Sequence, residues 1–246
     1  MSFNALVLAG SRGGRDPVAD YAGVTDKALI VVGGRTMLAR VTDALRGAGA
    51  ERIVVVVSST AVRDHARALG LETIDGAAGP SESAGRGFAL LGAPLLVTTA
   101  DHALLEPDWI MQFIANVPPG ADVAALLARR DTVERAMPET KRTYLRFSDG
   151  AWSGCNLFYL ATPQAAAAVK LWQRVERDRK RPWRIVRRLG PGLLLRYVIG
   201  RLPLSTALSH LGKTAGISAS MVASPYGLAA VDVDKPSDLD LVRGLI

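Results

Sequence analysis

The 246-residue chain contains a single cysteine, Cys155, which excludes an intramolecular disulfide and fits a reducing compartment. No apolar run is long enough to span a bilayer, because the best candidate, residues 192–200, is short and includes Arg196. The N-terminus leads directly into an apolar segment, without the parts of a secretory signal. These absences argue against a secreted disulfide scaffold and a membrane-spanning protein, and we expect a cytoplasmic protein.

Several chemical signatures are also missing. The chain has neither the GxxxxGK[ST] fingerprint nor the GxGxxG spacing of a dinucleotide loop. Its three histidines, His65, His102 and His210, lack the spacing of metal ligands. Cys155 stands among small and apolar residues with no marked histidine partner, so we expect it to pack in the core. The usual marks of P-loop NTPases, zinc proteins and thiol enzymes are therefore absent.

What the sequence does contain, within residues 6–38, is a short apolar strand, a glycine-rich loop and a following lysine. Glycines let backbone N–H groups approach a ligand closely, and cations can meet phosphate oxygens. The glycines are Gly10, Gly13 and Gly14, and the cations are Arg12, Arg15 and Lys27. Together they predict a triphosphate site at the end of a strand, although a glycine-rich turn with solvated arginines is the simpler alternative.

This segment resembles the signature of the molybdenum cofactor guanylyltransferase-like and sugar- and polyol-phosphate nucleotidyltransferases, LxGGxGxR followed by a spacer and a lysine. Gly10, Gly13 and Arg15 fall on that pattern, and Lys27 matches its phosphate-binding lysine. Ser11 stands where the family usually has its second glycine. The resemblance implies that Arg15 and Lys27 act on the reacting phosphate. It also implies a nucleotide-binding loop made of Leu8, Ala9, Gly10, Ser11, Arg12, Gly13 and Gly14.

Along the chain, apolar strands without alternation are separated by helices of about ten residues, which predicts a mostly parallel sheet covered on both faces. The fold class is thus α/β and Rossmann-like, and the resemblance implies the glycosyltransferase-A-like nucleotidyltransferase variant. We expect one domain over residues 1–246, with a basic helical insertion at 163–213. Ligands of such sheets bind beyond the carboxyl ends of the strands.

Carboxylates near those ends are candidate metal ligands. Asp101 ends the strand PLLVTTAD, and the resemblance implies that it binds Mg²⁺, with a turn or helix cap as the alternative. The segment AAVDVD predicts another strand, with Asp232 and Asp234 on one side of it. Asp232 is the preferred second ligand, and Asp234 is a further ligand, a supporting residue or a cap. Asp238 and Asp240 fit the first turn of the following helix.

Sites for the nucleotide base and for the acceptor are predicted from the positions that the resembled family uses for them. The resemblance implies a base or ribose contact in GPSESAGRG, between a strand and a helix, with helix capping as the alternative. It also implies an acceptor contact at the start of SGCNLFYL, and the basic pair before TYLRF could meet an acceptor phosphate or be surface charge. The nucleotide candidates are Ser81, Ser83 and Gly85, and the acceptor candidates are Asn156, Lys141 and Arg142.

The positive charge of the chain is concentrated in residues 170–213, which hold twelve Lys and Arg against two acidic residues. The remainder has 18 basic and 21 acidic residues, so it gives no indication of nucleic-acid binding. Trp172, Trp183 and aliphatic residues alternate with the arginines at helical spacing. The segment predicts either a peripheral contact with an anionic membrane or a packed helical subdomain with solvated arginines.

We therefore predict a Mg²⁺-dependent nucleotidyltransferase that transfers NMP from CTP or GTP to a phosphorylated small molecule or lipid headgroup. The first alternative is a nucleotide-sugar glycosyltransferase, which would use a D-x-D at the end of a central strand, where this chain has Thr-Ala-Asp-His. The second is a non-catalytic nucleotide-binding adaptor at a membrane surface. The sequence leaves the base, the acceptor and the oligomeric state open.

Overall fold

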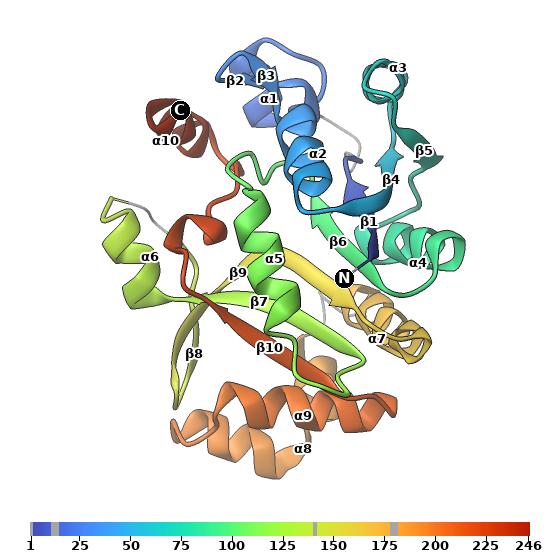
Figure 1. Ribbon diagram of the computed structural model, residues 1–246. Helices are drawn as coiled ribbons and strands as arrows, with labels where there is room; N and C mark the ends of the chain where they lie inside the picture. The colour runs from blue at the N-terminus through green and yellow to red at the C-terminus, as the bar shows by residue number, and fades with distance from the viewer. Residues whose placement is uncertain (1, 11–14, 140–141, 178–181) are drawn as a thin grey trace.

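The computed structural model describes residues 2–10, 15–139, 142–177 and 182–246, with the backbone alone for 182–189. Its main sheet has the strand order β10-β7-β9-β6-β1-β4-β5, and β8 pairs with β9 at one end (Figure 1). Neighbouring strands are parallel except around β9, which is antiparallel to β6, β7 and β8. The predicted mostly parallel α/β sheet is confirmed.

The strands are β1 (Phe3–Leu8), β2 (Val31–Val32), β3 (Arg35–Thr36), β4 (Ala50–Val57), β5 (Glu72–Asp75), β6 (Leu95–Thr99), β7 (Val123–Arg129), β8 (Leu145–Phe147), β9 (Gly150–Leu160) and β10 (Ala219–Ser224). The α-helices are α1 (Pro17–Ala22), α2 (Met37–Gly47), α3 (Thr60–Ala68), α4 (Pro80–Leu91), α5 (Pro107–Ala115), α6 (Arg130–Ala136), α7 (Ala166–Arg177), α8 (Pro182–Val198), α9 (Leu204–Ala215) and α10 (Pro236–Leu245). Short 3₁₀ helices are η1 (Lys27–Leu29), η2 (Pro163–Ala165) and η3 (Gly227–Ala230).

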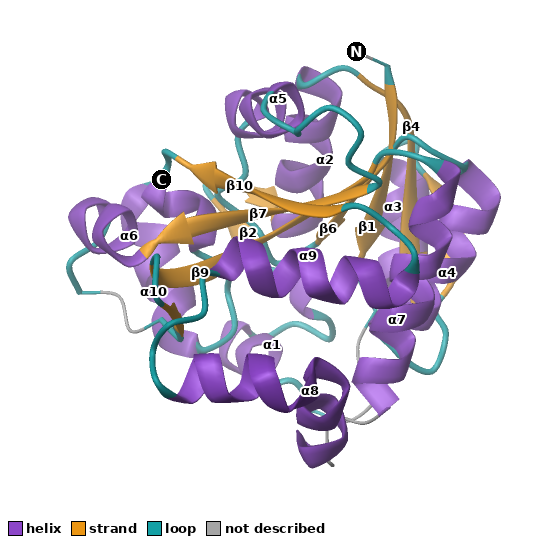
Figure 2. Ribbon diagram, turned by 90° about the horizontal axis from the view of Figure 1, so that it is seen from below, coloured by secondary structure: helices purple, strands orange, loops and turns teal. Residues whose placement is uncertain are grey.

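Helices cover both faces of the sheet, as the unbroken apolar strands predict. Val7 and its alternate neighbours on β1 pack in the larger core with α2 and α5, whereas Leu6 packs in a second core with α4 and α7. Successive side chains of a strand point to opposite faces, so one strand contributes to both cores. Figure 2 shows α5 and α9 on opposite sides of the sheet, with α8 outside α9. No helix among the described residues is long and apolar enough to cross a membrane.

Two local features differ from the sequence prediction. The spacer before Lys27 holds an unexpected helix, α1, which Asp16 caps by accepting from the N–H groups of Val18 and Ala19. The predicted strand AAVDVD is wrong, because residues 227–230 form η3 and residues 231–234 are irregular. Alternation along a strand therefore does not decide where Asp232 and Asp234 point.

Gly87 provides a test of how tightly α4 packs on the sheet. A Cβ at Gly87 would lie 2.3 Å from Cδ2 of the buried Leu6. We expect Gly87→Ala to lower the free energy of unfolding by about 1–3 kcal/mol, although alanine favours helices, because the core has no room for the methyl group. Gly244→Ala, in α10 and facing open space, should leave it unchanged or raise it slightly. Urea unfolding would measure both, and equal effects would contradict the packing argument.

Candidate active site

The strand order reverses beside β1, which lies between β4 on one side and β6 on the other. All three strands are parallel, so their carboxyl ends meet at one edge of the sheet. Backbone bonds continue the pairing past the strand ends, from Ala9 N to Val56 O at 3.0 Å and from Ala100 N to Leu8 O at 3.0 Å. This is the position at which open α/β sheets bind ligands. The glycine-rich loop leaves β1 at this edge, and Asp101 follows β6 at the same edge, as predicted.

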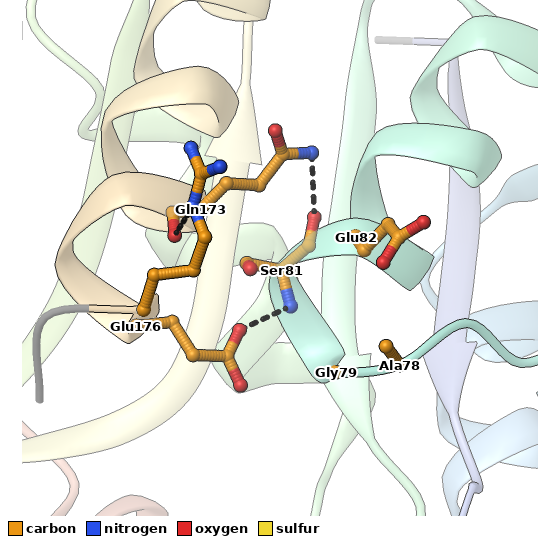
Figure 3. Close-up of a pocket in the computed structure, with 7 residues that line it drawn as sticks. Ala78, Gly79, Ser81, Glu82, Gln173 and Glu176 are labelled. Carbon is orange, nitrogen blue, oxygen red and sulfur yellow. Dashed lines mark hydrogen bonds between the residues drawn. The ribbon is translucent and has the colours of Figure 1, made fainter.

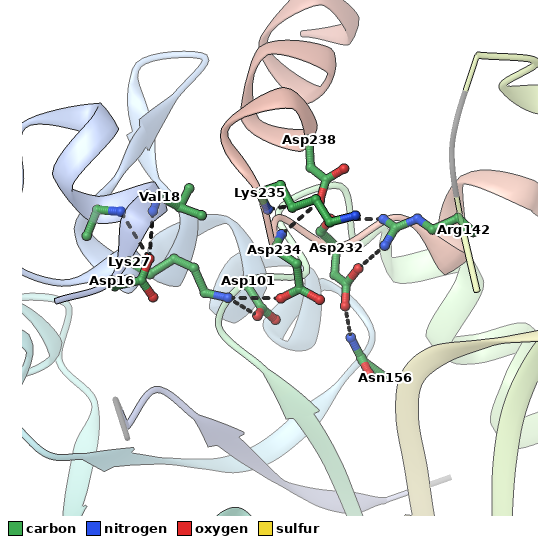
Figure 4. Close-up of polar contacts among 11 residues, drawn as sticks. Asp16, Val18, Lys27, Asp101, Arg142, Asn156, Asp232, Asp234, Lys235 and Asp238 are labelled. Atoms are coloured by element: carbon green, nitrogen blue, oxygen red, sulfur yellow. Dashed lines mark hydrogen bonds and ion pairs between the residues drawn. The ribbon is translucent and has the colours of Figure 1, made fainter. Parts of the chain in front are cut away.

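Lys27 lies between two of the predicted carboxylates (Figure 4). Its Nζ donates to Asp101 Oδ2 at 2.6 Å and to Asp234 Oδ1 at 3.2 Å. The Lys27 side chain is only 23% exposed, so these ion pairs are partly shielded from solvent. The structure thus brings together three predicted site residues from the N-terminus, the middle and the C-terminus of the chain.

The electrostatics of this group keep the lysine charged. Burial alone would lower the pKa of Lys27, but the carboxylates of Asp101 and Asp234 outweigh it and raise that pKa above its ordinary value. Burial and the nearby charge of Asp232 raise the pKa of Asp234, although Lys27 opposes them. His102, adjacent in sequence, is fully buried, and burial lowers its pKa to about 4, so it is neutral at pH 7.

Asp26 holds Lys27 in place, and the sequence analysis missed it. It is buried, its Oδ2 accepts from the hydroxyls of Thr25 and Ser59, and its carbonyl accepts from Leu29 N within η1. Ser59 follows β4, so the contact ties the lysine segment to the central sheet. An aspartate directly before the motif lysine is the only signal that the sequence offers, because the Ser59 hydroxyl that Asp26 binds is 33 residues away in the chain.

A second polar cluster lies next to the lysine and joins predicted metal and acceptor residues. Arg142 Nη1 forms an ion pair with Asp232 Oδ1, and its Nη2 donates to the Asp232 carbonyl at 2.9 Å. Asn156 Nδ2 donates to Asp232 Oδ2 at 2.7 Å. Asn156 also has a φ of 51°, a conformation that asparagine tolerates better than most residues. Both carboxylate oxygens of Asp232 are thereby engaged by side chains.

The C-terminal aspartates reach this edge through one backbone contact. Val233 N donates to the carbonyl of Asp101 at 3.1 Å, which fixes the irregular segment beyond β6. The cap of α10 is supplied by Asp238, whose Oδ2 accepts from the N–H groups of Asp234 and Lys235. The predicted role of Asp238 in the first turn is confirmed, and the capping alternative for Asp234 is wrong.

The other predicted residues of the nucleotide loop follow one another along the chain from the end of β1. Leu8 and Ala9 are half-buried and Gly10 is exposed at the end of β1. The Arg15 side chain is 93% exposed, and its Nε lies 3.9 Å from Asp20 Oδ2. The predicted residues Ser11, Arg12, Gly13, Gly14 and Lys141 lie outside the described residues.

A cavity of about 790 Å³ opens between the N-terminus of α4 and the end of α7 (Figure 3). Glu176 of α7 accepts from Ser81 N at 3.0 Å, and a Cβ at Gly79 would lie only 2.7 Å from Glu176 Oε1. The loop leading to this cavity is close to Gly10, the first residue of the glycine-rich loop, because Ser58 neighbours both Gly10 and Gly76. Ser81 is therefore placed on a cavity near the predicted nucleotide loop.

The other two nucleotide candidates have packing contacts. Ser83 is buried, and its hydroxyl accepts from Ala77 N at 2.9 Å. Gly85 allows α7 to approach α4, since a Cβ there would lie 2.8 Å from Gln173 Nε2. Gly79 is the N-cap of α4, so the alternative that one of the serines caps this helix is wrong.

The carboxylates can be tested against the needs of Mg²⁺. No group of three or more His, Cys, Asp or Glu within the described part of the chain could hold a metal by itself. Mg²⁺ in phosphate-transfer sites commonly uses one or two carboxylates together with substrate phosphates and waters. Asp101 Oδ1 is buried and has no hydrogen-bond partner, and such an oxygen fits a hard cation. Asp101, with Asp234 beside it, therefore suits a metal carried by a triphosphate.

Cys155 and its surroundings show no reactive thiol. The side chain is buried within β9, and burial raises its pKa to about 12. A thiol of this kind is protonated at pH 7 and is a poor nucleophile. Cys155 packs in the core, as expected from the sequence.

Comparison with known proteins places the chain in a protein family. Residues 5–193 match the family model of the MobA-like NTP transferase domain. A hypothetical transferase from Thermus thermophilus is 31% identical, with a TM-score of 0.83, over 97% of this chain and 100% of that chain. The family-model match includes residues 6–38, with the strand, the glycine-rich loop and Lys27.

More distant structures share the fold. CMP:2-keto-3-deoxy-manno-octonic acid synthetase, solved with CTP, is 15% identical with a TM-score of 0.60, over 100% of this chain and 98% of that chain. A 2-C-methyl-D-erythritol 4-phosphate cytidylyltransferase, also from Thermus thermophilus, is 16% identical with a TM-score of 0.58, over the same shares. At these identities the likeness concerns the fold alone.

Proposed function

Because the chain belongs to the MobA-like NTP transferase family and is a nucleotidyltransferase, we propose that it transfers NMP from CTP or GTP to a phosphorylated acceptor. The observation that carries the proposal is the position of Lys27 between Asp101 and Asp234, beyond the strand ends where the sheet order reverses. This arrangement places a cation and two carboxylates where a triphosphate would enter. Pyrophosphate is the second product.

In the proposed reaction, an oxygen of the acceptor phosphate or hydroxyl attacks the α-phosphorus while the bond to the β-phosphate oxygen breaks. Bound Mg²⁺ would supply charge neutralisation for the triphosphate. Lys27 would exchange part of its pairing with Asp101 for phosphate oxygens and stabilise the charge they gain. Asp101 and Asp234 would hold the metal, with Asp232 as the third predicted ligand. The reaction needs positioning rather than a covalent nucleophile.

Each substrate has a proposed place along this edge. Backbone N–H groups of the loop from Leu8 to Gly14, with Arg15, would contact the triphosphate, and Ser81 would contact the base or ribose from the cavity beside α4. Ser83 and Gly85 would support that cavity through their packing contacts. Arg142, Lys141 and Asn156 would face the acceptor.

The acceptor assignment makes a prediction for Arg142. Its Nε is buried without a hydrogen-bond partner, while its terminal nitrogens pair with Asp232. We expect Arg142→Lys to raise the KM for the acceptor by roughly tenfold, since a lysine cannot offer the planar fork of donors. The KM for the NTP should stay unchanged, and initial rates at varied concentrations of each substrate would measure both. A rise in the KM for the NTP instead would mean that Arg142 contacts the nucleotide and not the acceptor.

The function itself is tested by pyrophosphate release, screened across four NTPs and a set of sugar, polyol and lipid-headgroup phosphates. One NTP and one acceptor that together give Mg²⁺-dependent release support the proposal. Transfer of a sugar from a nucleotide sugar would favour the glycosyltransferase alternative, and nucleotide binding without turnover would favour the adaptor. We place this activity in the cytoplasm and in one domain over 1–246 with an insertion at 163–213. Residues 170–213 add the proposal of a peripheral membrane contact, which would make lipid-borne acceptors accessible.

A further inference from the structure

The end of α8 exposes an apolar surface with no counterpart elsewhere among the described helices. Four apolar residues there are between 45% and 73% exposed, namely Leu195, Tyr197, Val198 and Ile199. Single exposed apolar residues are ordinary, but four within five consecutive positions form a patch. We name this set, together with the exposed Leu145 of β8, the α8 tip.

The α8 tip is attached to the rest of the molecule by a few defined contacts. The rings of Tyr197 and Phe147 of β8 pack edge to face, with their centroids 5.7 Å apart. Ser148 N donates to the Leu202 carbonyl at 2.9 Å. Gly190, with a φ of 77°, interrupts α8, so the part after it is a short helix with its own direction. The tip is thus held on β8 while its outer side chains face solvent.

Basic residues flank this apolar surface. Arg196 lies within the tip, Arg201 follows it, and Arg146 is exposed on β8. Arg196 and Arg201 belong to the segment 170–213, which has a net charge of +10 in a chain whose remainder has −3. Arg146 is next to Phe147, whose ring contacts Tyr197 of that segment. An apolar surface with a basic rim matches the interface of an anionic bilayer, where apolar side chains enter the headgroup region and arginines meet lipid phosphates. Tyr197 is also of the type enriched at that interface.

The charge also argues against a second copy of the chain as the occupant. Pairing two identical tips would bring two strongly basic segments together, and like charges at an interface oppose association. We propose that the α8 tip binds anionic membranes peripherally, by inserting its apolar side chains between lipid headgroups.

This surface lies close to the candidate active site. β8 pairs with the start of β9 at the carboxyl end of β7, which is the same edge of the sheet as Asp101. Arg142, bound to Asp232, precedes Phe147 by five residues, so the chain between them spans at most about 18 Å. A membrane bound at the tip would therefore lie near the site, in reach of a lipid-borne phosphate acceptor. Membrane binding itself does not depend on the proposed catalytic activity.

The test is flotation of the full-length protein, without nucleotide, with vesicles of phosphatidylcholine alone or mixed with phosphatidylglycerol. We expect binding to the anionic vesicles at low salt, weaker binding at moderate salt and little binding to phosphatidylcholine. A Val198→Ser/Ile199→Ser variant should lower the partition coefficient by roughly tenfold or more, because each exposed side chain loses its apolar burial in the bilayer. An Arg196→Gln/Arg201→Gln variant should lower it by roughly thirtyfold.

A Val31→Ser/Leu90→Ser variant is the matched control, since both residues are exposed and apolar but lie on β2 and α4. It should bind as the parent protein does, and thermal unfolding should show all variants folded. Absence of flotation at low salt would overturn the proposal. So would equal losses in the control and the tip variant, or a tip variant that changes the oligomeric state in light scattering while keeping its vesicle binding. Because nucleotide is absent, none of these results depends on the proposed function.

Discussion

Replacing Lys27 by alanine should lower the rate of pyrophosphate release by on the order of a hundredfold or more. The lysine is the cation that the structure places between Asp101 and Asp234, and its removal withdraws charge stabilisation from the reacting phosphate. The raised pKa of Lys27 keeps it protonated at neutral pH. Its contribution to stability is therefore present at pH 7 and is lost only as the pH rises through its folded-state value.

This substitution also leaves two carboxylates facing each other, so it affects the fold as well as the chemistry. Lys27 begins η1 and its side chain is partly buried, so its removal also disturbs the packing around it. Lys27→Arg keeps the charge and separates the two effects, because it should retain stability while losing much of the rate. Lys213→Ala, exposed on α9, is the control and should match the parent. Initial rates and thermal unfolding of all variants would be compared.

Arg15→Ala is expected to reduce turnover by a similar factor if its side chain leaves Asp20 to meet a bound triphosphate. Rates within a few-fold of the parent for both Lys27→Ala and Arg15→Ala would remove the phosphate-binding assignment. Loss in the lysine variant alone would confine that assignment to the group around Lys27.

The parts of the fold that the sequence predicted are those in which local pattern and tertiary environment agree. β1, β4 and β6 are buried on both faces, so their apolar runs need no alternation. Lys27 and Asp101 could be brought together from the sequence because the loop that leads to Lys27 leaves the carboxyl end of β1 and Asp101 follows the carboxyl end of β6. These two strands are parallel, so their carboxyl ends share an edge.

The segment AAVDVD shows why other parts could not be predicted. Val231 and Val233 are buried and alternate with acidic residues, which is the pattern of a half-buried strand. No strand pairs with this segment in the described part of the chain, however. Its backbone is held instead by the bond from Val233 N to the Asp101 carbonyl and by the bond from Arg142 to the Asp232 carbonyl. The same burial pattern therefore arises without a sheet, and the destinations of Asp232 and Asp234 depend on Arg142, Asn156 and Lys27.

The α8 tip is a similar case. From the sequence, the arginines and tryptophans of 170–213 suggested an amphipathic helix with one apolar face. Gly190 interrupts that helix, and the exposed apolar residues gather after the interruption, around Val198. Exposure depends on how α8 lies against α9 and β8, which helical spacing alone cannot supply.

The second large effect is expected for Asp101→Asn, which should reduce Mg²⁺-dependent turnover by at least on the order of a hundredfold. Asp101 offers a buried, unpartnered Oδ1 for a cation, and an amide is a much poorer ligand for Mg²⁺ than a carboxylate. An asparagine could still accept from Lys27, so the lysine should stay in place. We expect the Mg²⁺ concentration for half-maximal rate to rise as well, which mere misplacement of Lys27 would not cause.

Comparison across the aspartates makes this prediction specific. Asp232→Asn should also abolish activity if Asp232 is a metal ligand; if it serves only to hold Arg142 and Asn156, the variant should change the acceptor KM and leave the Mg²⁺ dependence unaltered. Asp234→Asn should shift the Mg²⁺ dependence, since this carboxylate shares Lys27 with Asp101. Asp238→Asn is the control, because Asp238 accepts from the backbone N–H groups of Asp234 and Lys235, and its replacement weakens the α10 cap at a cost of about 1 kcal/mol while every predicted metal-binding side chain is kept. Equal losses of activity in the Asp101 and Asp238 variants, with lowered unfolding temperatures, would mean that these residues act through stability and that Asp101 does not bind the metal.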